Sequence, residues 1–204
     1  MIRALLPITA LLLGFAGPAL AERSVVKEEN GITVEEEPAP GRTLPVLTGT
    51  TTMAAPPKQI AAWIAAVHTF VDWQHNCEEA RRIRSQDGFA VAYNRIDSPW
   101  PVSDRDVVLR STLSDLEGGG IRIEFHNTTD ADVPEVDGVV RMPRLIGSYD
   151  LRPVEGGTRV VYTLDSDPGG SLPDWLVRRV SKDLPYFTLT NLRERAEAGL
   201  PPKE

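Results

Sequence analysis

The chain has 204 residues, of which 41% are hydrophobic and 25% are charged, a balance typical of a globular protein with a sizeable core. Its formal net charge of −7 argues against a nucleic-acid partner, because such partners require a basic face that displaces counterions. Cys77 is the only cysteine, so no intrachain disulfide can form and the fold must rest on its core. The Cys77 thiol is either reactive or, as is more common, a small apolar group at the start of a strand.

Residues 1–21 have the pattern of a targeting segment. A short basic start, Met1-Ile2-Arg3, precedes an apolar run, and Pro18-Ala19-Leu20-Ala21 ends it with small residues in an A-x-A arrangement. This pattern predicts a secretory signal peptide that is cleaved after Ala21, so that residues 22–204 form one domain in the periplasm or outside the cell. The alternative is a membrane anchor, but the apolar run is shorter than the roughly 20 residues that a span requires.

The hydrophobic pattern then predicts mostly strands. Residues 22–30 are polar, and we expect them to fray. Apolar residues recur at helical spacing from Ile60 to Val71, which predicts one helix that begins at Pro56-Pro57. The remaining segments are strand-like and are separated by Gly, Pro and Asp turns. They comprise a hairpin of 31–36 and 44–53 and a meander of 77–84, 89–96, 106–114, 121–126, 139–142 and 148–151 (interrupted around Pro143) and 158–165.

The last segment is helical. Ser171-Leu172-Pro173-Asp174 resembles a capping box, and Pro185 predicts a kink or break near Leu184. An antiparallel sheet of about seven strands twists and curls, and the long terminal helix must bury its apolar face in the concave side. We therefore predict an α+β fold in which the space between sheet and helix is either filled by side chains or holds a ligand.

No catalytic or metal-binding pattern is present. His68, His75 and His126 lack metal-ligand spacing, and no G-x-S-x-G nucleophile elbow occurs. We therefore predict no cofactor. The residues whose dry faces should converge on an internal cavity are instead aromatic or aliphatic, and core filling is the default role for each of them; they are Tyr93, Leu109, Ile123, Phe125, Tyr149, Tyr162, Trp175, Val180, Leu184 and Phe187.

The corner between the strands at 89–96 and 106–114 is the most distinctive motif. It has the sequence Ser98-Pro99-Trp100-Pro101-Val102-Ser103-Asp104-Arg105-Asp106. Two prolines make it stiff. A general interpretation is a packed structural corner of Trp100, Arg105 and Asp106 in which the two charged residues form a surface salt bridge.

The corner also resembles the hallmark corner of the START (StAR-related lipid-transfer) family within the helix-grip, or SRPBCC, superfamily. Segments 70–81, 147–160 and 167–176 resemble further parts of that family. The resemblance implies a curved sheet that grips a C-terminal helix over a lipid-sized cavity, with a lid formed by Leu172–Leu192 and a loop at Ser114–Gly120. Some sterol-binding members carry an acidic residue and an arginine in the cavity; the corresponding positions here are Ala92 and Ser111, so that pair is absent.

Three functions are compatible with these features. The first is an exported, non-enzymatic protein that binds or transfers a lipid or other apolar small molecule, and transient contact with a membrane is compatible with it. The second is a cyclase- or hydrolase-like enzyme on the same fold. Its acid and base groups would be Tyr93, Tyr162 or His126, although alternation places His126 opposite Phe125, facing outward. The third is an interaction module with a filled core.

Overall fold

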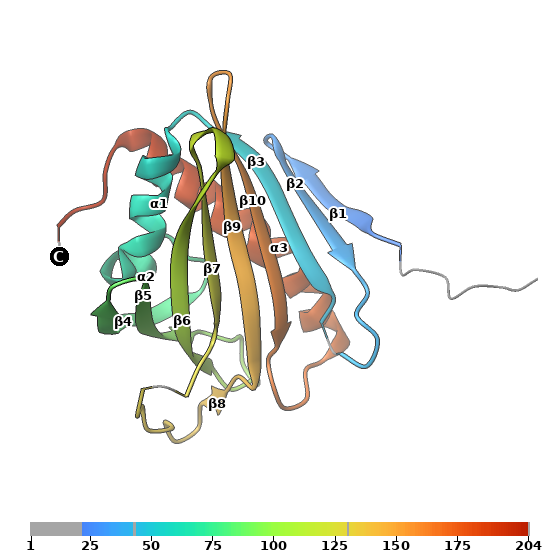
Figure 1. Ribbon diagram of the computed structural model, residues 1–204. Coiled ribbons are helices and arrows are strands. Elements are labelled where there is room, and N and C mark those ends of the chain that lie inside the picture. The colour runs from blue at the N-terminus through green and yellow to red at the C-terminus, as the bar shows by residue number, and fades with distance from the viewer. Residues whose placement is uncertain (1–21, 43, 130, 204) are drawn as a thin grey trace, which may run out of the picture.

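The computed structural model describes residues 22–42, 44–129 and 131–203 (Figure 1). The predicted signal peptide, residues 1–21, lies outside the described residues. Within the described ranges, no helix is both long enough and apolar enough to span a membrane.

The described chain forms one ten-stranded sheet with the order β1-β2-β3-β10-β9-β7-β6-β5-β4. All neighbouring strands in this order are antiparallel, and β8 pairs with β6 in parallel. The strands are β1 (Ser24–Glu29), β2 (Ile32–Glu37), β3 (Val46–Met53), β4 (Cys77–Gln86), β5 (Phe89–Ile96), β6 (Arg105–Leu116), β7 (Gly120–Asn127), β8 (Val140–Arg141), β9 (Arg144–Val154) and β10 (Gly157–Asp167).

The helices are α1 (Pro57–Ala65), η1 (Val67–Thr69), α2 (Phe70–Trp73), η2 (Glu117–Gly119) and α3 (Asp174–Ala198). The long helix α3 crosses one side of the curved sheet and packs against β1, β2, β3, α1 and α2 (Figure 1). Gly49 permits the close approach of α3 to β3, since a Cβ at this position would stand 2.6 Å from Leu189 Cδ1 and 3.3 Å from Pro185 Cβ. The predicted α+β helix-grip architecture is therefore confirmed.

Four local predictions are wrong. Residues 24–29 do not fray: β1 pairs with β2 through backbone hydrogen bonds, which need no apolar alternation. The helix predicted to reach Val71 is broken at Ala66, whose φ of −81° and ψ of 71° are not helical, and Val71 is 47% exposed. The capping box does not form, because Pro173 occupies the N-cap of α3 without a side-chain cap. The predicted break near Leu184 does not occur: helix α3 continues through Pro185, and Tyr186, Leu189 and Leu192 pack in the main core.

The core has two parts. The larger lies between the concave side of the sheet and the helices. The smaller lies on the convex side, where Val91, Tyr93 and Val108 are covered by Ala131 and Val133 of the segment that connects β7 to β8. As a result, strands β5 and β6 are buried on both faces, which matters for the placement of the polar residues described below.

Candidate ligand-binding pocket

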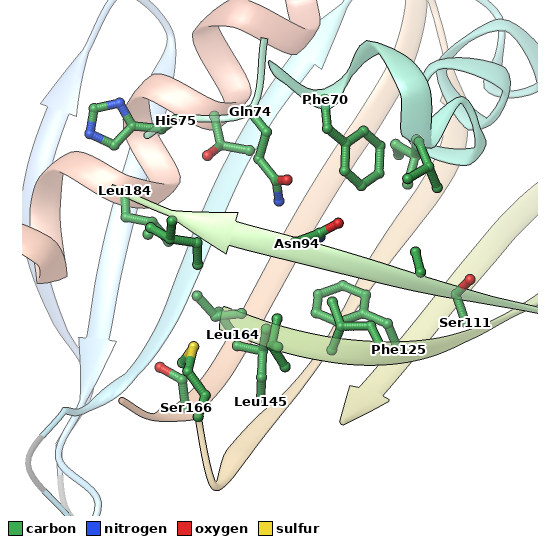
Figure 2. A pocket seen from close by; sticks show the side chains of 18 of the residues that line it. Phe70, Gln74, His75, Asn94, Ser111, Phe125, Leu145, Leu164, Ser166 and Leu184 are labelled. Carbon is green, nitrogen blue, oxygen red and sulfur yellow. The ribbon is translucent and has the colours of Figure 1, made fainter. Parts of the chain in front are cut away.

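A pocket of about 570 Å³ lies between the concave face of the sheet, the α1–α2 region and the N-terminal half of α3. Figure 2 shows Phe70, Asn94, Phe125, Leu145 and Leu184 around it, contributed by α2, β5, β7, β9 and α3, respectively. Its walls are predominantly apolar, with Ile64, Phe70, Val107, Leu109, Ile123, Phe125, Met142, Leu145, Leu164, Leu172, Leu176, Val180 and Leu184 among the lining residues.

The strand sequences explain why this space stays open. Ala90, Ala92 and Ser111 face it from β5 and β6, and their small side chains cannot fill it. On the next two strands, Phe125 of β7 is paired with Gly147 of β9. A Cβ at Gly147 would stand 2.4 Å from Phe125 Cζ, so the glycine allows the aromatic ring to lie against the sheet rather than across the pocket.

Seven of the ten predicted lining residues do line this pocket: Leu109, Ile123, Phe125, Tyr149, Tyr162, Val180 and Leu184. The other three do not. Tyr93 points to the convex side, because alternation along β5 directs Ala92 and Asn94 inward, and the 131–133 segment buries the tyrosine there. Trp175 is 43% exposed and Phe187 is 37% exposed, while the adjacent Leu176 and Tyr186 turn inward. These three residues are corrections to the predicted set.

Tyr149 and Tyr162 form a polar spot in the apolar wall. Their rings are stacked, with centroids 4.4 Å apart and planes 7° from parallel. Both residues are buried, and burial raises the pKa of both hydroxyls well above the usual value for tyrosine, with a further contribution to Tyr149 from interaction with the Tyr162 hydroxyl. Both side chains are therefore neutral phenols at physiological pH, able to hydrogen-bond but not to act as a base.

Arg105 and Asp106 do not form the predicted surface salt bridge. Alternation along β6 directs them to opposite sides of the sheet, and they are only 5% and 1% exposed, respectively. Asp106 accepts hydrogen bonds from Arg141 Nε at 2.7 Å and from Arg141 Nη2 at 3.1 Å on the convex side. Arg105 lines the pocket on the concave side and donates to the backbone carbonyls of Ser103 and Gly169.

The structure also reveals polar lining residues that the sequence did not single out. Asn94 is 3% exposed, and its Oδ1 atom has no hydrogen-bond partner among the residues that the structure describes; Figure 2 shows its side chain directed into the pocket. His75 lines the pocket and stacks on Phe187, with ring centroids 5.0 Å apart, and burial lowers its pKa. Alternation could have indicated Asn94, since it lies two residues from Ala92, but the fold is needed to show that this face is the inner one.

The remaining reactive candidates lie elsewhere. His126 is exposed on the outer side of β7 and does not line the pocket. Cys77 packs at the edge of the main core, and burial raises the pKa of its thiol to about 11, so the thiol stays protonated. In the ranges that the structure describes, no group of three His, Cys, Asp or Glu side chains is arranged to hold a metal ion.

The corner residues close one end of the pocket. The Ser98 backbone N–H donates to Asp104 Oδ1 at 3.0 Å, and the Val102 N–H donates to the Pro99 carbonyl at 3.0 Å. Pro99 lines the pocket, whereas Trp100 projects from the corner and is 91% exposed. The corner therefore positions Arg105 at the pocket wall while presenting an aromatic side chain to the outside.

A curved sheet that encloses an apolar pocket against a terminal helix defines the helix-grip class. Residues 24–197 match the START domain. The chain therefore belongs to the START family. It is 34% identical over 192 residues, or 93% of its own length and 95% of the relative, to an uncharacterized protein of Pseudomonas aeruginosa. It is 32% identical over 109 residues to the phosphatidylcholine transfer protein of Rattus norvegicus, covering 51% of each chain.

Solved structures show the same fold. A STAR-related lipid transfer protein fragment from Xanthomonas axonopodis superposes with a TM-score of 0.78 at 28% identity, covering 85% of this chain and 98% of that one. Human StAR-related lipid transfer protein 5 gives a TM-score of 0.78 at 19% identity, covering 90% and 89%. An aromatase/cyclase of Streptomyces gives 0.51 at 15% identity, covering 75% and 91%. The last two are similar in fold alone.

Proposed function

We propose that this protein is a non-enzymatic carrier that holds a lipid or other apolar small molecule in the pocket between the sheet and α3. The observation that carries this proposal is the 570 Å³ space lined mainly by apolar side chains. Its size lies within the range of sites that enclose small organic ligands. Each buried CH₂ group of a ligand contributes about 0.8 kcal/mol, so an acyl chain alone supplies substantial binding free energy.

Similarity to lipid-transfer proteins supports the same class of ligand. The name of the Rattus norvegicus relative specifies phosphatidylcholine transfer, but the match covers half of each chain. The apolar wall is contributed by β5, β6, β7, β9 and β10, by the α1–α2 region and by α3, so the features that would hold an acyl chain extend over most of the domain. We therefore propose the broad class of apolar ligand rather than that relative's particular lipid.

The character of the pocket residues supports binding rather than catalysis. Of the three acid–base candidates from the sequence, Tyr93 and His126 lie outside the pocket, and Tyr162 is a neutral phenol with a raised pKa. A neutral phenol in an apolar wall is suited to a hydrogen bond with a bound ligand. The likeness to an aromatase/cyclase is one of fold alone.

We further propose that the protein works after export. The proposal rests on the sequence of residues 1–21, with its basic start, apolar run and small-residue cleavage pattern. A water-soluble carrier in the periplasm would lower the free energy of moving an apolar molecule across an aqueous space between membranes.

The test is native mass spectrometry of the protein purified without detergent from the periplasm of its own cells. We expect a discrete added mass that extracts into organic solvent. The variant Ala92→Phe, which places a ring in the pocket, should lose the added mass, whereas Ser148→Phe, on the convex side of β9, should keep it. A wild-type protein that stays ligand-free after incubation with phospholipids, sterol-like lipids and fatty acids would overturn the proposal.

A further inference from the structure

We propose that Arg105, assisted by Asn94, binds the anionic head group of the ligand, so that the pocket prefers amphiphiles that carry a phosphate or carboxylate. This inference rests on the proposed carrier function and specifies which apolar molecules the pocket selects. The shared chemistry is an oxyanion attached to a hydrocarbon chain. The argument depends on the charge of Arg105, on its hydrogen bonds and on the composition of the pocket wall.

The positive charge of Arg105 is buried without an ion-pair partner among the described residues. Arginine keeps its proton in proteins, and a buried charge is costly unless a counter-charge accompanies it. Arg122, Arg141 and Arg144 each contact a carboxylate within 2.7 Å. Arg105 forms no such contact, and burial lowers its pKa while the attraction of nearby Asp104 opposes that change. A bound anion would supply the missing counter-charge.

The hydrogen-bonding capacity of Arg105 is also incompletely used. Nη1 donates to the Ser103 carbonyl, and Nη2 donates to the Gly169 carbonyl at 3.4 Å, which is long for a hydrogen bond. Nε is buried and has no hydrogen-bond partner within the part of the chain that the structure describes. A guanidinium with a free Nε edge can donate to the oxygens of a phosphate or carboxylate, the strongest type of hydrogen bond that arginine forms.

Asn94 is placed to assist. It is paired with Val107 across β5 and β6, so Arg105, two residues from Val107, is its diagonal neighbour on the same face. Its side chain enters the pocket (Figure 2), and its Oδ1 atom has no hydrogen-bond partner in the described ranges. An amide carries both donors and an acceptor, so Asn94 can donate to an oxyanion and accept from a hydroxyl of the ligand.

The wall of the pocket carries an excess of positive charge although the chain carries −7 overall. Its formally charged lining residues are Arg82, Arg105 and Asp97, and Asp97 is exposed. Arg105 also borders a second pocket of about 340 Å³, between the corner and residues 170–173, and the described side chains that line it include no acid. The guanidinium therefore lies in the wall between the apolar interior and a surface hollow, where the head of an amphiphile could sit while its chain extends inward.

The test compares three probes with the same 18-carbon chain, bound to delipidated protein and measured by isothermal titration calorimetry: oleate, oleoyl lysophosphatidic acid and oleyl alcohol. We expect one or both anionic probes to bind at least tenfold more tightly than the alcohol. Arg105→Met should remove that preference and leave alcohol binding within about threefold of the wild type. The anionic probe that binds more tightly identifies carboxylate or phosphate as the preferred head group.

Control variants distinguish loss of the head-group contact of Arg105 from a general effect of mutation on the protein. Arg122→Met, on the convex side, should change neither preference nor affinity, because Arg122 pairs with Asp150 away from the pocket. If Arg105→Met does not fold, Asn94→Leu provides a second variant with an expected several-fold loss for the anionic probes alone. Inorganic phosphate should bind far more weakly than the lysophospholipid, because it lacks the chain.

The outcomes are distinguishable. Equal binding of oleate, lysophosphatidic acid and oleyl alcohol would overturn the proposed role of Arg105 in head-group binding while leaving the carrier function intact. An equal loss of all three probes in Arg105→Met would also overturn it, as would inorganic phosphate binding as tightly as the lysophospholipid. Failure of every probe to bind the wild-type protein would instead contradict the carrier function itself.

Discussion

Two adjacent charged residues of β6, Arg105 and Asp106, lie on opposite faces of the sheet and have different partners. On the convex face, Asp106 is matched by Arg141, and the same guanidinium donates to the carbonyls of Val133 and Pro134 at 3.4 Å and 3.1 Å. This network fixes the segment between β7 and β9 over Tyr93. On the concave face, Arg105 donates to two backbone carbonyls, and no carboxylate of the described residues pairs with it.

The difference shows that burial alone does not reveal what a charge does. Both side chains are almost completely removed from solvent, yet Asp106 is neutralised within the chain and Arg105 faces the pocket. A charge satisfied by the chain contributes to the folded structure, whereas a charge left unsatisfied beside a cavity is available to a ligand. Mutation of Asp106 should therefore mainly lower stability, whereas mutation of Arg105 should mainly weaken ligand binding.

The largest expected effect is on the convex side. Asp106→Asn should lower the free energy of unfolding by about 3 kcal/mol, because breaking a buried pair leaves an uncompensated charge. We expect the lower end of the usual range, since the Arg141 side chain is 25% exposed and can turn towards water. Urea denaturation measures the change.

The matched control for this variant is Asp150→Asn, which breaks the more exposed pair with Arg122 on the same face of the sheet. We expect a loss of about 1 kcal/mol or less there. If Asp106→Asn were no more destabilising than Asp150→Asn, the convex network would not be a main source of stability.

A smaller effect on stability is expected at the neighbouring residue. Arg105→Met should change the unfolding free energy of the ligand-free protein by about 1 kcal/mol or less, because no ion pair is broken and the desolvation of a charge is relieved. Urea denaturation of delipidated protein tests this. The added stability that an anionic ligand gives to the wild type should be reduced in the variant, since stabilisation follows affinity.

A loss from Arg105→Met as large as that from Asp106→Asn would show that both residues are structural. That result would remove the contrast between the two faces. Arg105→Lys distinguishes charge from geometry: it keeps the charge but lacks the forked donors of the guanidinium, so it should retain part of the preference for anions.

The sequence predicted the overall fold because its signals are local and repeated. Alternation in residues 121–126 predicted a strand with one dry face, and the structure places Ile123 and Phe125 inward and His126 outward. The hairpin of β2 and β3 and the terminal helix α3 were indicated in the same way. Strand β1 was missed because its residues are polar, and its pairing depends on the backbone rather than on side chains.

The site was harder to predict, because sequence periodicity identifies two faces without saying which is the inner one. On β5, Tyr93 is buried beneath the 131–133 segment and Asn94 is buried in the pocket wall, so the prediction that Tyr93 lines the cavity is wrong. On α3, adjacent apolar residues such as Trp175 and Leu176 differ in direction by about 100°. The partner of Asp106, Arg141, is 35 residues away, and nothing local indicates the pairing.

The smallest expected effect concerns Tyr93, which lies beside the Asp106 carboxylate. Burial and the adjacent carboxylate together raise the pKa of Tyr93 to about 12. Because the unfolded-state value is about 10, the folded state favours the neutral phenol. This contribution to stability is fully present below pH 10 and is lost as pH rises through 12, and the loss reaches about 1 kcal/mol by pH 11.

Between pH 9 and pH 11, the unfolding free energy of the wild type should therefore fall more steeply than that of Tyr93→Phe, which denaturant titration at several pH values can resolve. In an Asp106→Asn background the difference between tyrosine and phenylalanine should shrink, because one of the two causes of the raised pKa is gone. An unchanged difference in that background would attribute the raised pKa to burial alone and would leave Asp106 acting only through Arg141.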